Sequence, residues 1–147
     1  MIQMVLTTSY EKPDVDWQEL ADLIERAGLS RRDPHTLQRA YQHSQFVWFG
    51  YVEGKLMATA HAISDMTYAS YLSDVIVDAT FQGKGYGGQL MAAIMQALAP
   101  CGKVFIYSMP DKISFYKKLG YAPLTTGMIY AEGTALLRLQ EKGFVSG

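Results

Sequence analysis

The chain has 147 residues, of which 49% are hydrophobic and 18% charged, enough for one globular domain with its own core. Thirteen Lys and Arg residues against fourteen Asp and Glu residues give a net charge of −1, so we expect no nucleic-acid partner. The sequence has one cysteine, no signal-peptide pattern and no apolar run near the ~20 residues that cross a bilayer. These features predict a cytoplasmic protein without membrane contact.

The first part of the chain predicts a strand followed by two helices. Alternating and β-branched residues favour a strand over residues 2–8. Asp16 suits the N-cap of a helix whose apolar residues recur at helical spacing, and Gly28 suits its left-handed end. Asp33 and Pro34 form the cap and first residue of a second helix.

The middle of the chain predicts three strands in succession. Residues 46–52 and 55–63 form a hairpin that turns at Glu53-Gly54, and residues 70–78 form the third strand. A continuous series of strands joined by short turns is typical of an antiparallel arrangement.

A helix–strand–helix series follows. We expect a helix from Gly87 to Pro100, a buried strand over residues 103–109 and a short helix that Asp111 caps and Gly120 ends. The crossover between residues 77 and 103 should join parallel strands. Residues 121–140 predict one or two terminal strands. The domain is therefore mixed α/β.

Four glycines, Gly83, Gly85, Gly87 and Gly88, lie between the third strand and the following helix. They remove Cβ atoms where a ligand could approach the backbone. The helix that starts there has N–H groups without intrahelical acceptors and a positive dipole end. This combination favours binding of a phosphate or pyrophosphate, although a simple flexible turn is the alternative.

Two other phosphate-binding patterns fit less well. The P-loop requires a Gly-Lys-Ser/Thr ending that this chain lacks. A Rossmann fingerprint is formally present as Gly83, Gly85 and Gly88, with Asp111 near the expected distance. These glycines follow Val77 by several residues, however, whereas the fingerprint requires an immediate turn.

Residues 82–87, Gln-Gly-Lys-Gly-Tyr-Gly, resemble the Q/R-x-x-G-x-G/A segment of the GCN5-related N-acetyltransferases (GNAT). Residues 113–123, ISFYKKLGYAP, resemble the second signature of that family, and the element order agrees over nearly the whole chain. The departures are Gln82 for the family's arginine, Ala79 for its common proline and a missing asparagine before the second signature.

The resemblance implies a single N-acetyltransferase domain over residues 1–147. Its central sheet would be mostly antiparallel with one parallel strand pair, flanked by about four helices. It also implies acetyl-CoA as co-substrate, with a homodimer as a family-level expectation. No metal is expected, because the thioester is already activated and no cluster has metal-ligand spacing.

The resemblance further implies roles for particular residues. The backbone N–H groups of Ile76 and Val77 would bind the acetyl carbonyl and pantetheine, and Tyr116 would protonate the departing thiolate. The pyrophosphate would bind the amides of Gln82, Gly83, Lys84, Gly85, Tyr86, Gly87 and Gly88.

The general base is left open by the residues themselves. Asp74 is the first candidate, because a carboxylate within an apolar strand needs a reason to be there. His61 and a water relay are the alternatives. Cys101 lies away from both signatures and is expected to be packed, which favours direct attack over an acetyl-cysteine intermediate. Arg31 and Arg32 are interpreted as solvated loop charges.

The predicted function is acetyl-CoA-dependent transfer to a primary amine of a small molecule through a ternary complex. The alternatives are a Rossmann-type NAD(P)-binding oxidoreductase and a non-catalytic acyl-CoA-binding module. The resemblance implies that the acceptor would bind near residues 28–34 and 125–132. An aromatic wall there would come from Trp48, Phe49, Tyr68, Tyr71, Tyr107 and Tyr130, although ordinary core or surface positions are the alternative for these.

Overall fold

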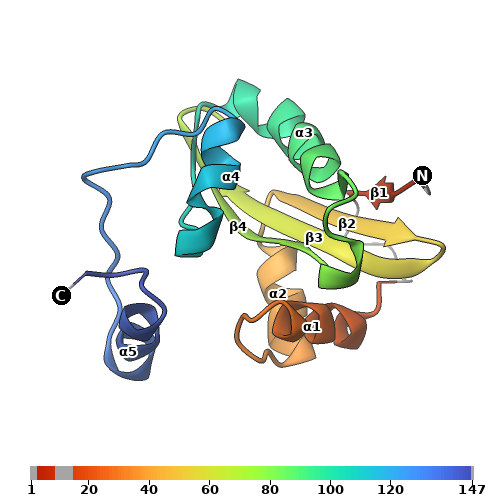
Figure 1. Ribbon diagram of the computed structural model, residues 1–147, viewed down its shortest axis with the longest axis horizontal. Helices are drawn as coiled ribbons and strands as arrows, with labels where there is room; N and C mark the ends of the chain where they lie inside the picture. Colours follow the sequence, from red (N-terminus) through yellow and green to blue (C-terminus); the bar gives the residue numbers. More distant parts are fainter. Residues whose placement is uncertain (1–2, 9–14, 147) are drawn as a thin grey trace. The chain divides into compact units, whose positions relative to one another are not determined.

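The computed structural model describes residues 3–8 and 15–146 (Figure 1). The chain divides into two compact units, Met1–Ile106 and Tyr107–Gly147, which are taken in turn. Ile2, the first residue of the expected N-terminal strand, lies outside the described residues.

The N-terminal unit contains the two helices that the caps predicted, α1 (Trp17–Arg26) and α2 (Pro34–Gln42). Asp16 accepts hydrogen bonds from the first-turn N–H groups of α1, and Asp33 accepts one at the start of α2. Gly28, after α1, has a φ of 89°. Both capping predictions are confirmed, because each carboxylate satisfies a donor that the helix leaves without a partner.

In the part of the chain that the structure describes, five strands form one sheet in the order β1-β2-β3-β4-β5. Their bounds are β1 Val5–Thr7, β2 Phe46–Val52, β3 Lys55–Ser64, β4 Ala69–Val77 and β5 Lys103–Phe105. The first three pairs are antiparallel and β4 pairs with β5 in parallel. The predicted fold class is confirmed, including the parallel pair across the crossover.

Two local features of the sheet were also predicted. The β2–β3 hairpin turns at Glu53 and Gly54, whose φ angles are 51° and 76°. Between β4 and β5 the chain passes through a short 3₁₀ turn (Ala79–Phe81), helix α3 (Tyr86–Leu98) and a second 3₁₀ turn (Ala99–Cys101). Helix α3 begins one residue before the expected position.

The sheet lies between two helical layers, with α1 and α2 on one face and α3 on the other (Figure 1). The first layer packs through a buried cluster that includes Leu20, Leu23, Ile24, Leu37, Tyr41, Phe49 and Ile76. Helix α3 contributes the buried Leu90, Met91, Ile94 and Leu98. This packing fixes β3 and β4, the two strands that carry the site described below.

The C-terminal unit contains a 3₁₀ turn (Pro110–Lys112), α4 (Ile113–Lys118) and α5 (Gly133–Glu141). Asp111 lies inside the 3₁₀ turn and does not cap α4, contrary to the prediction. Gly120 follows α4 with a φ of 95°, as expected.

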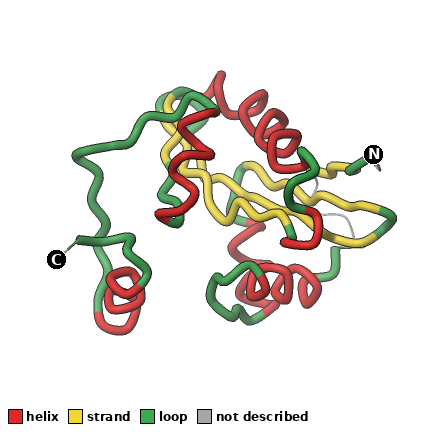
Figure 2. Tube along the Cα trace, in the orientation of Figure 1, coloured by secondary structure: helices red, strands yellow, loops and turns green. Residues whose placement is uncertain are grey.

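The expected terminal strands over residues 121–140 are not present in the described chain. Figure 2 shows coil after α4 and then helix α5. The described residues therefore contain five α-helices, where about four were expected. Residues 135–141 are Ala, Leu, Leu, Arg, Leu, Gln and Glu, all of which have high helix propensity, which explains the helix.

Candidate functional site

The glycine-rich stretch of residues 82–88 joins the end of β4 to α3. Gly83 and Gly85 have φ of 79° and 85°, in the left-handed region that favours glycine. No side chain caps α3. A Cβ placed on Gly83, Gly85 or Gly88 would meet no protein atom within 4 Å. The loop therefore leaves space beside a helix N-terminus, where backbone donors and the dipole favour an anion.

Gln82 ties this loop to the strand that precedes it. Its backbone N–H donates to the carbonyl of Ala79 at 3.3 Å, and its side-chain Nε2 donates to the carbonyl of Val77 at 3.0 Å. The amide of Gln82 is thus already engaged within the protein. Among the amides that were expected to bind pyrophosphate, those of residues 83–88 belong to the open part of the loop.

The end of β4 is also anchored to α1. The Asp78 carboxylate accepts a hydrogen bond from Arg26 Nη2 at 2.9 Å and two from Thr80. Burial would raise the pKa of Asp78, but the hydrogen bonds from Thr80 and Arg26 outweigh it and lower that pKa. Lys84 Nζ lies 5.9 Å from the centroid of the Phe81 ring. These contacts fix the approach to the glycine loop.

The Ile76 amide is directed at β3. Asp78 N–H donates to the carbonyl of Met57 at 2.7 Å, and the same register pairs Ile76 with Thr59. Hydrogen-bonded pairs alternate with non-bonded pairs along an antiparallel ladder. Asp78 and Met57 form a hydrogen-bonded pair, and Ile76 and Thr59 lie two residues further along the ladder, so they form the next hydrogen-bonded pair. The Ile76 amide is therefore used within the β3–β4 ladder.

Val77 lies between the Ile76–Thr59 and Asp78–Met57 pairs, so its N–H and carbonyl are directed away from β3, at the opposite edge of β4. Its carbonyl accepts the hydrogen bond from Gln82 there. The pairing of β4 with β5 covers residues 69–71, and β4 continues past it to Val77. Ile76 and Val77 were both expected to contact acetyl-CoA through their amides. Only the Val77 amide faces the edge of β4 away from β3, and no described strand pairs with that edge beyond residue 71.

A β-bulge precedes this edge. Asp74 and Val75 together lie opposite Ala60, so β4 carries one extra residue. Asp74 has a φ of 53°. Among the described residues, the other non-glycine residues with positive φ are Glu53 and Met66, which lie between strands. Asp74 adopts this disfavoured conformation inside a strand.

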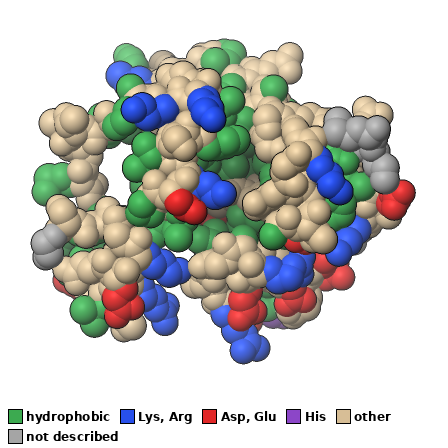
Figure 3. All heavy atoms as spheres, in the orientation of Figure 1, with side chains coloured by type: hydrophobic (Ala, Val, Ile, Leu, Met, Phe, Trp, Pro, Cys, Tyr) green, Lys and Arg blue, Asp and Glu red, His purple; other side chains and the backbone are tan. Residues whose placement is uncertain are grey.

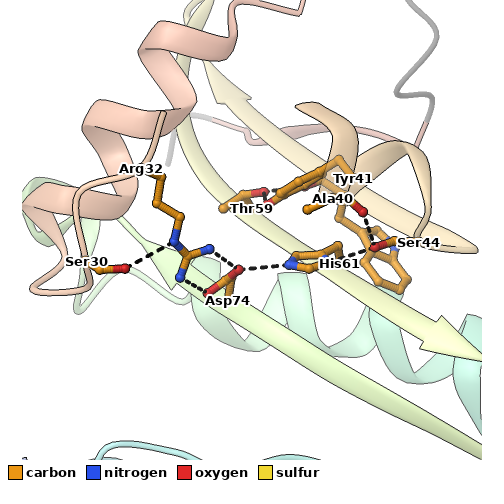
Figure 4. A network of polar contacts seen from close by, with 9 residues as sticks. Ser30, Arg32, Ala40, Tyr41, Ser44, Thr59, His61 and Asp74 are labelled. Carbon is orange, nitrogen blue, oxygen red and sulfur yellow. Dashed lines mark hydrogen bonds and ion pairs between the residues drawn. The ribbon is translucent and has the colours of Figure 1, made fainter. Parts of the chain in front are cut away.

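The Asp74 side chain is the centre of a polar network (Figure 4). Arg32 donates to both carboxylate oxygens, from Nη1 at 2.7 Å and from Nη2 at 2.9 Å. His61 Nε2 lies 2.8 Å from Asp74 Oδ2, and His61 Nδ1 lies 2.9 Å from Ser44 Oγ. Ser44 Oγ in turn donates to the carbonyl of Ala40. The network joins the α1–α2 loop, β4, β3 and the end of α2.

The two ring nitrogens of His61 contact different groups. Nδ1 lies at hydrogen-bond distance from Ser44 Oγ, which also donates to the carbonyl of Ala40. The ionised Asp74 is an acceptor only, so it accepts from His61 Nε2. The His61 ring is thereby held between a carboxylate and a hydroxyl oxygen.

Asp74 is a weak base in this environment. Burial would raise its pKa, but the hydrogen bonds from His61 and Arg32, together with their charges, lower the pKa to about 2. A carboxylate with this pKa holds a proton poorly near neutral pH, which weighs against the role of general base that the sequence suggested. Arg32, interpreted as a solvated loop charge, is instead part of this ion pair.

A second buried contact supports the network. The Tyr41 hydroxyl lies 2.7 Å from Thr59 Oγ1, which donates to the carbonyl of Trp48. The Tyr41 ring centroid lies 4.4 Å from that of His61. Burial raises the pKa of Tyr41 far above its usual value, so its hydroxyl stays protonated.

Tyr116 lies on α4 in the C-terminal unit. Burial raises its pKa to about 12, with a smaller contribution from neighbouring Tyr121. Its ring packs edge-on against those of Phe115 and Tyr121. The phenol is therefore protonated near neutral pH, as a proton donor must be.

The remaining expected residues fall into buried and exposed groups. Trp48 and Phe49 are core residues, which matches the alternative given for them, whereas Tyr68 and Tyr130 are largely exposed. Cys101 is buried, with Sγ 3.7 Å from the carbonyl of Ala97, as expected of a packed thiol.

Three further observations concern the surface charge, the grouping of possible metal ligands and the length and polarity of the helices. On the face drawn in Figure 3, acidic and basic side chains are intermixed. Within residues 3–8 and 15–146, no three His, Cys, Asp or Glu side chains are grouped so that they could hold a metal ion. In the same ranges, each helix is too short or too polar to span a bilayer.

Comparison with known proteins gives a family. A model of the acetyltransferase (GNAT) family matches residues 15–121. Serotonin N-acetyltransferase 2, chloroplastic, from rice (Oryza sativa subsp. japonica) is 31% identical over 114 residues, which cover 74% of this chain and 57% of that protein. GCN5-related N-acetyltransferase 1, chloroplastic, from Arabidopsis thaliana is 29% identical over 126 residues, covering 83% and 62%. The chain thus spans less than two thirds of the length of these relatives.

A solved structure confirms the fold. The structure of a GNAT family acetyltransferase from Streptococcus pneumoniae matches with a TM-score of 0.72 at 18% identity, covering 88% of this chain and 98% of that one. The expected cytoplasmic location, by contrast, is wrong. It relied on the absence of a targeting pattern, whereas both curated relatives are named as chloroplastic and point to the chloroplast.

Proposed function

Because the chain belongs to the acetyltransferase (GNAT) family, we propose that it transfers the acetyl group of acetyl-CoA to a primary amine of a small molecule. The observation that carries the proposal is the open glycine loop at the N-terminus of α3. Both acetyl-CoA and the acceptor would be bound together, with direct attack on the thioester.

The pyrophosphate of acetyl-CoA would bind the amides of residues 83–88. The left-handed glycines and the open space beside them support this, because a phosphate needs close approach to several N–H groups. Gln82 supports the site because its side chain donates a hydrogen bond to the end of β4 and so holds the loop against that strand. Lys84 is exposed in this loop and adds a positive charge.

The acetyl carbonyl would accept a hydrogen bond from the Val77 amide, which is directed at the open edge of β4. As the amine nitrogen attacks, negative charge develops on the carbonyl oxygen, and a fixed donor stabilises it. Because the Ile76 amide is directed at β3, we give this part to Val77 alone.

The chemistry would then proceed by collapse of the tetrahedral adduct. The new C–N bond forms and its nitrogen loses a second proton to water. The C–S bond breaks and the thiolate of CoA leaves with a proton from Tyr116, which solvent then reprotonates. The amine has to lose its proton before it attacks. The low pKa of Asp74 makes it unsuitable for that step, so we assign deprotonation to water and give Asp74 a positioning role.

The acceptor class we propose is an aralkyl amine. One relative that is 31% identical is named a serotonin N-acetyltransferase, and its match covers 74% of this chain. Serotonin and tryptamine are therefore the first acceptors to test. A polyamine and a lysine-containing peptide serve as comparison acceptors of different shape.

Binding is tested first, because it separates the three candidate functions. Acetyl-CoA should raise the melting temperature and bind in a calorimetric titration, while NADH should do neither. Tight binding of NADH with no response to CoA would instead indicate an oxidoreductase.

Transfer is then measured as release of the free CoA thiol with each amine, and the product is identified by mass spectrometry. Acetylated serotonin or tryptamine would support the proposed acceptor class. Acetyl-CoA binding without transfer to any of the four acceptors would favour the acyl-CoA-binding module.

A further inference from the structure

Hydrogen bonds from Arg32 and His61 converge on the carboxylate of Asp74, at the bulge of β4. We propose that Arg32 and His61 are positioning residues for acetyl transfer: through the Asp74 carboxylate they hold the β4 bulge, which turns the Val77 amide to the open edge of the sheet. The proposal rests on the proposed function, in which that amide binds the acetyl carbonyl.

The bulge determines which edge of β4 each of the following backbone amides faces. Ser73 lies opposite His61, and Ile76 lies opposite Thr59. His61 and Thr59 are two residues apart on β3 and share a face, so Ser73 and Ile76 share a face although they are three residues apart. The backbone N–H groups of a strand also alternate between its two edges with a period of two residues. Without the extra residue, the Val77 amide would be directed at β3.

The conformation of the bulge needs support from outside the strand. A φ of 53° is disfavoured for a residue with a side chain and persists only where the surroundings enforce it. The Asp74 side chain is 9% exposed and accepts three hydrogen bonds, two from the Arg32 guanidinium and one from His61. Because the carboxylate is one methylene from Cα, fixing it also restrains the backbone of residue 74.

The two anchors come from different layers of the fold (Figure 4). Arg32 lies in the α1–α2 loop and grips both carboxylate oxygens, a geometry that lysine cannot reproduce. His61 lies on β3, and its other ring nitrogen is held by Ser44 at the end of α2. The carboxylate is therefore fixed relative to both the helical layer and the neighbouring strand.

The first test uses backbone amide hydrogen exchange in the free protein, and so does not depend on the proposed function. In the wild type, we expect the Ile76 amide to be protected and the Val77 amide to exchange much faster. Arg32→Gln and His61→Leu should reduce or reverse this contrast. Arg31→Gln removes the same charge from the exposed neighbouring residue and should leave the contrast unchanged.

The second test measures turnover with acetyl-CoA and the best acceptor. Arg32→Gln and His61→Leu should each lower kcat by about tenfold, since loss of a whole oxyanion donor costs about 10²–10³-fold. His61→Gln keeps an N–H donor in place of Nε2 and should recover most of the activity, whereas Arg32→Lys should recover little. The Kd of CoA, which lacks the acetyl group, should be unchanged, and melting curves should confirm that each variant folds.

A third measurement separates positioning from base catalysis. Asp74→Asn should lower kcat while the pH profile of kcat/KM keeps its shape, because no proton is exchanged by the carboxylate. Loss of one limb of that profile would instead identify Asp74 as the base and overturn the proposal. So would an unchanged exchange contrast in Arg32→Gln and His61→Leu. If the wild type shows the contrast but binds no acetyl-CoA, the proposed function fails while the structural role of the two anchors stands.

Discussion

Gly102 lies directly against the carbonyl of Tyr68, so close that a Cβ at position 102 would stand 2.3 Å from that oxygen. The same carbonyl accepts a hydrogen bond from Lys103 N–H at 2.9 Å, at the start of β5. This approach fixes where the parallel strand β5 begins alongside β4.

We therefore expect Gly102→Ala to be strongly destabilising. The φ of 95° disfavours alanine, and the clash is with backbone that cannot move aside. The loss in the free energy of unfolding should be about 2 kcal/mol or more. Gly28→Ala is the matched control, since its φ is 89° but a Cβ there meets nothing within 4 Å. Denaturant unfolding should show the smaller loss at Gly28, and equal losses would contradict the steric argument.

Gly88→Ala should separate stability from ligand binding. Gly88 lies in the first turn of α3, and a Cβ there would meet no protein atom. Alanine has the higher helix propensity, so the free protein should be more stable by up to about 1 kcal/mol. If the pyrophosphate lies against this turn, the Kd of acetyl-CoA should rise about tenfold or more, because the added methyl group occupies its place. Unchanged affinity in a calorimetric titration would place the pyrophosphate elsewhere.

Tyr116→Phe should slow turnover without weakening cofactor binding. Removal of a general acid lowers kcat by about 10²-fold or more, whereas the ring still packs against its neighbours. The Kd of acetyl-CoA should stay within about twofold of the wild type, because the hydroxyl acts only on the leaving thiolate. Tyr68→Phe removes a hydroxyl from a largely exposed side chain and serves as the control. Equal turnover of the two variants at saturating substrates would remove Tyr116 from the mechanism.

Because of the Asp74 ion pair, the free energy of unfolding should decrease as the pH becomes acidic. The pKa of Asp74 falls from 3.8 to about 2 in the folded protein, so the charged form is favoured by folding. The contribution is fully present above the unfolded pKa and is lost as the pH falls through about 4 towards 2. It amounts to about 2 kcal/mol in the free energy of unfolding.

Unfolding of Asp74→Asn and of the wild type, measured from pH 7 to pH 2, gives the test. The difference in the free energy of unfolding should be largest near neutral pH and shrink at the acid end. Arg32→Gln should reduce the same pH dependence, because it removes one of the two partners that lower the pKa. A difference that stays constant with pH would show that the carboxylate gains nothing from its partners.

The sequence by itself determined the features that depend on local chemistry. Asp16 and Asp33 cap their helices, Glu53-Gly54 turns the hairpin, and Gly83 and Gly85 adopt left-handed backbone just before a helix start. Each of these is decided by the residue and its immediate neighbours, because caps and turns are formed within a few residues. The two family signatures are also local, and they were enough to predict the family and its fold.

Only the tertiary structure decided the partners of Asp74 and the edge that each amide faces. Arg32 and Asp74 are 42 residues apart, and no spacing rule joins a loop arginine to a strand carboxylate. The bulge opposite Ala60 shifts the register of β4 by one residue, a change that the apolar sequence of the strand does not reveal. Strands were expected over residues 121–140, although the helix propensity of residues 135–141 favours the helix α5 that is found there. A strand forms only where a neighbouring strand accepts its hydrogen bonds, and that condition is set by the folded chain.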